Sequence, residues 1–106
     1  MVLAAPYTRK KRALIEDAVR RVEAVFAPDV VRIKYYFSED WLGEPSVYFR
    51  VLIRDEAGQL ERLKSLSWPV RKALIDEVQT DECELGAYFE FRTVSEQLEL
   101  RDPAWE

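Results

Sequence analysis

The sequence has no histidine, and it has only three glycines and one cysteine among its 106 residues. Without histidine, a Ser-His or Cys-His catalytic pair, a histidine general base and every zinc site with a histidine ligand are excluded. Neither a Gly-x-x-x-x-Gly-Lys nor a Gly-x-Gly-x-x-Gly string occurs, so the phosphate-binding loops of nucleotide-binding enzymes are missing as well. We therefore expect a protein that is not an enzyme and binds no cofactor.

The single cysteine, Cys83, has no second cysteine with which to form an internal disulfide. Its neighbours Asp81, Glu82 and Glu84 are acidic and disfavour a thiolate, so we interpret Cys83 as a structural residue. Clusters of carboxylates such as this one can hold Mg²⁺ at converging strand ends, but acidic loops are usually only solvated. We predict no metal site.

Long hydrophobic runs are absent too, since no apolar stretch approaches the roughly 20 residues that span a bilayer. Residues 1–6 are mostly apolar, but the basic residues follow this stretch, whereas a secretory signal peptide would carry them in front of it. The sequence thus predicts a cytoplasmic protein without a membrane segment. Its net charge is −4, with basic residues in excess over 1–35 and acidic residues in excess afterwards. Neither a nucleic acid nor a basic protein is excluded as a partner.

Hydrophobic periodicity divides the chain into helices and strands. Apolar residues recur every three or four positions over 8–26 and again after the turn at 55–58, which is typical of amphipathic helices. Pro69 lies inside the second pattern, so we expect either two helices, 59–66 and 68–79, or one helix kinked at the proline. Alternation with a period of two predicts strands over 30–37, 46–54 and 87–94.

The order α-β-β-α-β predicts an α+β protein with one compact domain over residues 1–106. We expect a three-stranded, mainly antiparallel sheet with the helices packed on one face, and fraying of residues 1–7 and 101–106. The strand with Arg32 and Lys34 is expected to be central if the second helix returns the chain alongside the hairpin. The alternation assigns these side chains to the buried face: Val31, Ile33, Tyr35, Val47, Phe49, Val51, Phe89 and Phe91.

The opposite face of the sheet is expected to mix cations with aromatic rings. Its predicted members are Arg32, Lys34, Tyr36, Tyr48, Arg50, Arg54, Tyr88 and Arg92, with Glu90 among them. Interleaved rings and cations can stack bases and pair with phosphates, as single-stranded RNA-binding surfaces do. An open sheet face must also be polar for solvation alone, and Tyr and Arg are good strand residues there. A solvated face, a protein-binding surface and an RNA-binding surface all remain open.

Two large apolar residues, Trp41 and Leu42, follow Asp40 in the loop between the first two strands. Burial at a hairpin tip is difficult in a small domain, so Trp41 either folds back over the edge of the core or contacts a partner. Trp68, just before Pro69, is expected in the core or at a helix start. Trp105 is expected either to fray or to anchor an assembly.

The hairpin also carries a resemblance. Residues 40–45 read Asp-Trp-Leu-Gly-Glu-Pro, Phe-Arg-Val follows at 49–51, and a late Tyr-Phe-Glu-Phe-Arg at 88–92 precedes Ser-Glu-Gln at 95–97. Over about residues 15–105 the chain resembles a family of small uncharacterised bacterial proteins. The resemblance implies the smaller member of a toxin–antitoxin-like gene pair whose neighbour encodes a HEPN-like protein, and it implies no site chemistry that can be transferred.

Two functional hypotheses follow. The first is a non-enzymatic, antitoxin-like protein-binding module whose protein partner is encoded by an adjacent gene. The partner would be bound by Asp40, Trp41 and Leu42, by the open sheet face or by the acidic tail. The second is a small RNA- or single-strand-binding domain that uses the Arg/Tyr face. The acidic net charge favours the first hypothesis.

Overall fold

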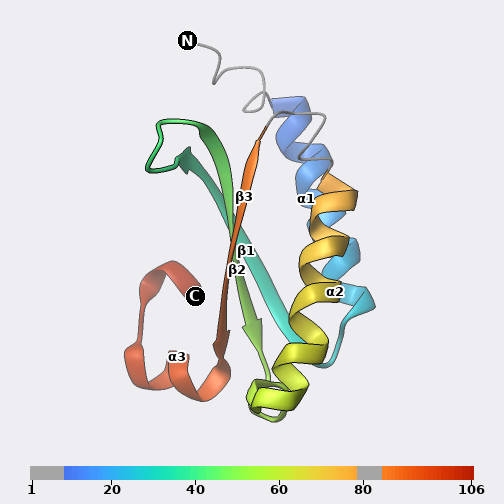
Figure 1. Ribbon diagram of the computed structural model, residues 1–106, viewed down its shortest axis with the longest axis vertical. Coiled ribbons are helices and arrows are strands. Elements are labelled where there is room, and N and C mark those ends of the chain that lie inside the picture. The colour runs from blue at the N-terminus through green and yellow to red at the C-terminus, as the bar shows by residue number, and fades with distance from the viewer. Residues whose placement is uncertain (1–8, 79–84) are drawn as a thin grey trace.

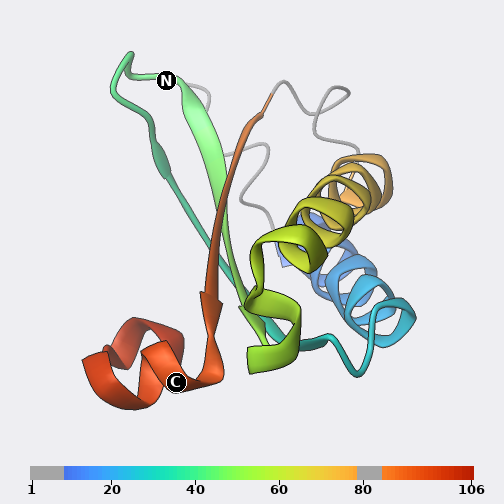
Figure 2. The ribbon, with the colours of Figure 1, turned by 60° about the horizontal axis from the view of Figure 1, so that its bottom comes forward.

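The computed structural model describes residues 9–78 and 85–106. The elements are α1 (Arg9–Val25), β1 (Val30–Glu39), β2 (Pro45–Ile53), the 3₁₀ helix η1 (Asp55–Gly58), α2 (Leu60–Val78), β3 (Gly86–Thr93), α3 (Val94–Leu100) and the 3₁₀ helix η2 (Pro103–Trp105) (Figure 1). The predicted α+β class is confirmed. The two long helices, α1 and α2, pack side by side on one face of the sheet, and α3 and η2 lie on its other side (Figure 2).

The sheet has the order β1-β2-β3, with β1 antiparallel and β3 parallel to β2. The central strand is therefore β2, and the expectation that the strand with Arg32 and Lys34 is central is wrong. From the end of β2, α2 runs back along the sheet and places β3 directly beside β2, as in a β-α-β unit. The far edge of β1 is thus left without a strand among the described residues.

The predicted register of the hairpin is confirmed. Ile33, Val47 and Phe49 are fully buried, as is Val51, and the other predicted core aromatics pack half-buried against the same cluster: Tyr35, Phe89 and Phe91. Val31 is the exception, because a shift in register between Val30 and Arg32 turns Val31 outward and buries Val30 in its place.

Each long helix buries one stripe of side chains. In α1, Ile15, Val19 and Val22 are buried, whereas the neighbouring apolar residues Leu14 and Val25 are exposed. Leu14 lies outside the buried stripe because positions that differ by one residue point about 100° apart on a helix of 3.6 residues per turn.

The second long helix, α2, continues through Pro69 as one helix instead of breaking into two. Leu66, Val70 and Leu74 are buried on one stripe that crosses the proline, and their packing offsets the ~3 kcal/mol that an interior proline costs a helix. Trp68, expected in the core or at a helix start, lies inside the helix and is 60% exposed. Its side chain is therefore available on the surface of α2.

Some expectations fall outside this description. Cys83 and residues 1–7 lie outside the described residues. Of the helices in the described part of the chain, none is long and apolar enough to cross a membrane.

Candidate functional site

The cross-strand register sorts the outward side chains of the sheet into rows. We call the face opposite α1 and α2 the outer face. Across β1, β2 and β3 it carries Tyr36, Tyr48 and Tyr88, which we call the tyrosine row. Two further rows, which we call the basic rows, follow: Lys34, Arg50 and Glu90, then Arg32, Leu52 and Arg92. The predicted alternation therefore brings seven of the eight predicted sheet-face residues onto one surface.

The eighth predicted residue, Arg54, has a different role. Its Nε lies 2.6 Å from Oδ1 of Asp29, whose other carboxylate oxygen is 2.8 Å from Nη2 of Arg62. The hydrogen bond from Arg54, with that from Arg62, lowers the pKa of Asp29. Arg54 thus joins the start of β1, the end of β2 and the start of α2, instead of contributing to the outer face.

In the tyrosine row the rings stack on one another. The ring centroids of Tyr36 and Tyr48 are 4.9 Å apart and those of Tyr48 and Tyr88 are 5.0 Å apart, with interplanar angles of 10° and 17°. The guanidinium of Arg50 lies 4.3 Å from the centroid of Tyr36. Because the ring faces already contact one another, they offer fewer free faces for a nucleobase than the sequence pattern indicates.

The β1–β2 loop is closed by backbone bonds around Asp40. The Asp40 N–H donates to Glu44 O and the Gly43 N–H donates to Asp40 O, both at 2.9 Å. Gly43 has φ +80°, a conformation that glycine adopts without steric cost. An Asp followed three residues later by a left-handed glycine is a common pattern for such a tight hairpin loop.

The Asp40 carboxylate fixes the loop a second time. Its Oδ1 accepts the N–H groups of Leu42 and Glu44, each at 2.9 Å, and its Oδ2 accepts the Tyr88 hydroxyl at 2.8 Å. The bond from the Glu44 N–H, followed by that from Tyr88, lowers the pKa of Asp40, and the same carboxylate raises the pKa of Tyr88. The loop is therefore tied to β3 as well as to its own strands.

Trp41 and Leu42 lie at the apex of this fixed loop and point into solvent. Trp41 is 85% exposed and Leu42 is 64% exposed. Of the two alternatives for Trp41, folding back over the core is therefore wrong. Two large apolar side chains are presented together on a backbone that is held in one conformation.

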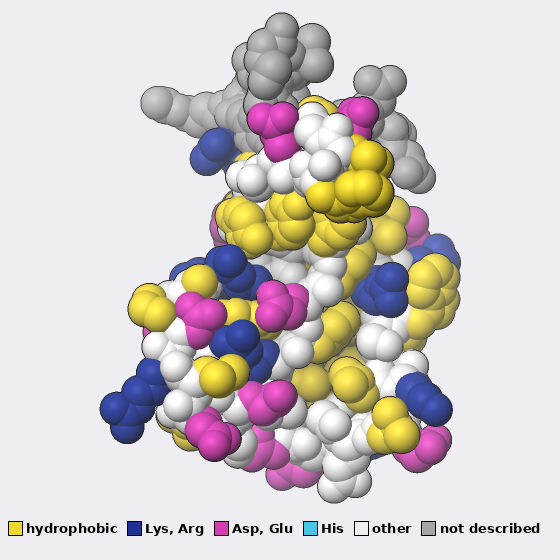
Figure 3. All heavy atoms as spheres, turned by 60° about the vertical axis from the view of Figure 1, so that its left-hand side comes forward, with side chains coloured by type: hydrophobic (Ala, Val, Ile, Leu, Met, Phe, Trp, Pro, Cys, Tyr) yellow, Lys and Arg dark blue, Asp and Glu magenta, His cyan; other side chains and the backbone are white. Residues whose placement is uncertain are grey.

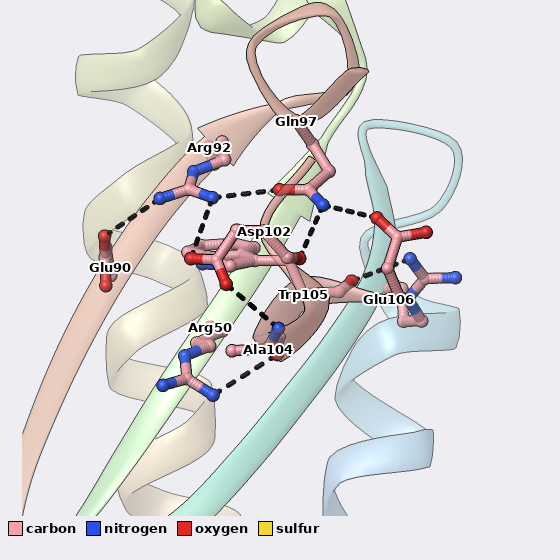
Figure 4. A network of polar contacts seen from close by, with 9 residues as sticks. Arg50, Glu90, Arg92, Gln97, Asp102, Ala104, Trp105 and Glu106 are labelled. Atoms are coloured by element: carbon pink, nitrogen blue, oxygen red, sulfur yellow. Dashed lines mark hydrogen bonds and ion pairs between the residues drawn. The ribbon is translucent and has the colours of Figure 1, made fainter. Parts of the chain in front are cut away.

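The basic rows are covered by the end of the chain. We call residues 94–106 the C-terminal segment; it contains α3 and η2. Three cations of the sheet donate to its backbone oxygens: Arg32 to Trp105 O at 2.9 Å, Lys34 to Glu106 O, and Arg50 to Ala104 O at 3.2 Å. Figure 4 shows the bond from Arg50 to Ala104. Residues 101–106, which were expected to fray, are thus docked on the outer face.

Trp105 anchors this segment. Its side chain is only 2% exposed, and the guanidinium of Arg92 lies 4.3 Å from the centroid of its ring. Arg92 also donates to the side chain of Gln97 at 2.9 Å, and buried Gln97 donates to the backbone of Asp102 at 2.8 Å and to the carboxylate of Glu106 (Figure 4). These contacts hold Nη1 and the guanidinium plane of Arg92 against the C-terminal segment.

Two local sequence signals predict the starts of the helices in the C-terminal segment. Thr93 and Glu96 form a capping box at the start of α3, which lowers the pKa of Glu96 through its bond from the Thr93 N–H. Asp102 caps η2 and is followed by Pro103, a residue suited to a first helical position. Both signals predict local structure, but neither indicates that the segment packs on the sheet.

The surface of the outer face has a hydrophobic part and a charged part. Figure 3 shows a band of hydrophobic side chains in its upper part, above a region where side chains of both charges are interspersed. A hollow of about 290 Å³ is lined by the tyrosine row together with Arg50 and Glu90. Among the described residues, no group of three or more Cys, Asp or Glu side chains is placed to hold a metal ion.

Comparison of the chain with protein-family models, with curated protein sequences and with solved structures finds no match.

Proposed function

We propose that this chain is a non-enzymatic protein-binding module that recognises its partner with the apex of the β1–β2 loop. The observation that carries the proposal is Trp41, which is 85% exposed although the backbone on both sides of it is held by Asp40. Tryptophan is enriched among the residues that dominate protein interfaces. A loop that is already ordered also loses little conformational entropy when it binds.

The loop defines what the partner offers. Trp41 and Leu42 need an apolar pocket, and exposed Glu39 and Glu44 on either side favour basic residues around its rim. The resemblance to antitoxin-like proteins makes the product of an adjacent gene the first partner to examine. In this proposal the chain regulates that partner by occupying its pocket.

A single-stranded RNA remains the second candidate, and the tyrosine row with Arg50 is the observation that favours it. It is the weaker candidate because Arg32, Lys34 and Arg50 already donate to the C-terminal segment and Arg92 stacks on Trp105. An RNA would have to use cations that are engaged within the chain.

The test is capture of partners from a lysate of the native host by the tagged full chain, with and without nuclease. We expect a protein that is retained after nuclease treatment and lost when Trp41→Ala replaces the native chain. With the purified partner, Trp41→Ala should weaken binding at least tenfold, since truncation of a buried interface tryptophan costs on the order of 2–4 kcal/mol.

The matched control is Trp68→Ala, which removes another exposed tryptophan from the surface of α2. It should leave capture unchanged, and both variants should melt within a few degrees of the native chain because neither tryptophan is buried. Equal capture by Trp41→Ala and the native chain would refute the loop as the recognition element. Capture that depends on nucleic acid and not on Trp41 would favour the RNA candidate.

A further inference from the structure

The outer edge of β3 carries no strand among the described residues. β3 pairs with β2 over eight consecutive positions, from Ser46 opposite Gly86 to Ile53 opposite Thr93, without any shift in register. The backbone groups on its other edge can accept another strand. β1, at the opposite edge, has features that discourage such pairing: a register shift next to Arg32, and Lys34.

A groove lies between β3 and α2. It has a volume of about 360 Å³ and is lined by Leu63, Ser67, Arg71, Ala87, Tyr88, Phe89 and Phe91. Phe89 and Phe91 are half-buried, and the guanidinium of Arg71 lies 5.4 Å from the ring centroid of Phe89. An added strand would find hydrogen-bonding groups at the edge and apolar side chains next to it.

We propose that the occupant of this edge is β3 of a second copy of the chain, paired antiparallel with Phe91 at the twofold axis. In this register Phe91 lies opposite Phe91 of the second copy, and Glu90 lies opposite Arg92 of the second copy on both sides of the axis. The pairing spans residues 89–93 of each copy, because α3 begins at Val94. Opposite charges placed directly across an antiparallel pair are stabilising. A register centred on Glu90 would instead place two carboxylates opposite each other, and one centred on Phe89 would place Glu90 opposite Tyr88.

The side chains of Glu90 and Arg92 can make these pairs. The side chain of Glu90 is 62% exposed and that of Arg92 is 14% exposed, and Oε2 of Glu90 lies 3.6 Å from Nη2 of Arg92 on its own strand. The bonds of Arg92 to Gln97 and Asp102 use Nη1. Nη2 is therefore the atom that a carboxylate of the second copy would approach, while Nη1 keeps its place in the network around Trp105.

The pairing yields a continuous six-stranded sheet with α2 of each copy on the same face. Because the loop with Trp41 lies at the end of the sheet where β3 begins, the antiparallel pairing places the two loops at opposite ends of the joined sheet. The dimer is then a bivalent form of the chain. This inference does not depend on the proposed function, since it concerns the edge of β3 and not the β1–β2 loop.

The experiment is sedimentation equilibrium of the full chain from about 1 µM to about 1 mM, a range that covers the affinities of most weak and moderate dimers. We expect a monomer–dimer equilibrium for the native chain. Glu90→Arg places like charges opposite each other at two symmetric positions and should raise the dimer dissociation constant about tenfold or more. Asp17→Arg, the same change of charge at an exposed carboxylate of α1, should leave that constant unchanged.

Thermal melts of both variants establish that they are folded, and hydrogen exchange reports where the copies meet. Amides of β3 should become more protected as the native chain is concentrated, and those of Glu90→Arg should not. A native chain that stays monomeric throughout the range overturns the proposal, as does a dimer that Glu90→Arg leaves intact or that Asp17→Arg weakens equally. In those cases the groove belongs to a different occupant or to none.

Discussion

Replacing Trp105 by alanine should destabilise the folded chain by about 3–5 kcal/mol, the range for truncation of a buried tryptophan. Trp105 is 2% exposed, and burial of 150–250 Å² of aromatic surface at ~25 cal/mol per Å² gives a similar figure of about 4–6 kcal/mol. The variant would also remove the ring that lies 4.3 Å from the guanidinium of Arg92. The guanidinium of Arg92 would then lose its cation–π contact with the ring of Trp105.

The destabilisation caused by Trp105→Ala has an upper limit. The C-terminal segment is joined to the rest of the chain only at the end of β3, so it can detach as a unit once its docking becomes unfavourable. The destabilisation then stops at the docking free energy of the segment. Once Trp105 is gone, Gln97→Ala should cost little more, whereas in the native chain it should cost about 1–3 kcal/mol because it breaks a buried hydrogen-bond network.

The assay is urea unfolding followed by far-UV circular dichroism, because fluorescence would change with the removed tryptophan itself. Trp68→Ala is the control, and a change within about 0.5 kcal/mol is expected for that exposed site. Since a domain of this size has only about 5–15 kcal/mol of stability, the native chain and Trp105→Ala should have clearly separated midpoints. A loss below about 1 kcal/mol, or one no larger than that of Trp68→Ala, would refute the assignment of the segment as part of the fold.

Three further predictions concern the core, the carboxylates and the outer face. Phe49→Ala should cost about 3–5 kcal/mol in urea melts, because Phe49 is fully buried against the ring of Phe89, and a loss under about 1 kcal/mol would contradict the core assignment. The pKa values of Asp29, Asp40 and Glu96 are lowered in the folded chain, so the free energy of unfolding should be at its full value above the unfolded pKa values near 4 and should fall as the pH drops below them. Asp29→Asn should make that decline shallower, and an unchanged pH dependence would count against the Arg54 pair. If the chain binds single-stranded RNA, the slope of log affinity against log salt should be roughly −0.7 per phosphate contacted and shallower for Arg50→Ala, and an absence of binding at low salt would remove that candidate.

The parts of the fold that the sequence predicts are those decided over short distances along the chain. A period of two places Ile33, Val47 and Phe49 on one side of the hairpin whatever surrounds it, and all three are buried. Asp40 and Gly43 specify the loop within five residues. Where two local solutions are equally good, tertiary packing makes the choice. The apolar residues of α1 cover more of its circumference than the sheet buries, and the pattern alone does not reveal that Leu14 and Val25 face solvent.

The same reasoning explains why the predictions of a central strand with Arg32 and Lys34 and of a buried Val31 are wrong. A hairpin followed by a helix can add its next strand on either side, and the choice of β2 as the central strand depends on where α2 packs. A bulge displaces one residue without a strong signature in the sequence. The alternation of apolar and polar residues therefore continues past Val31 in the sequence, although the register of β1 with β2 shifts there.

On the outer face, the sequence pattern predicts which residues share a surface but not which groups they contact. Alternation places Arg32, Lys34 and Arg50 on one surface, but it does not say which acceptors they meet. In the folded chain those acceptors are backbone oxygens more than fifty residues away, carried by a segment whose only large apolar residue at the sheet is Trp105. One isolated tryptophan has no period from which a buried face can be inferred, so the docking that occupies the cations leaves no pattern in the sequence. The exposed Trp41 is different, because the turn residues that hold it are its immediate neighbours. A loop built from local turn chemistry can therefore be predicted from sequence, whereas a surface completed by a distant segment cannot.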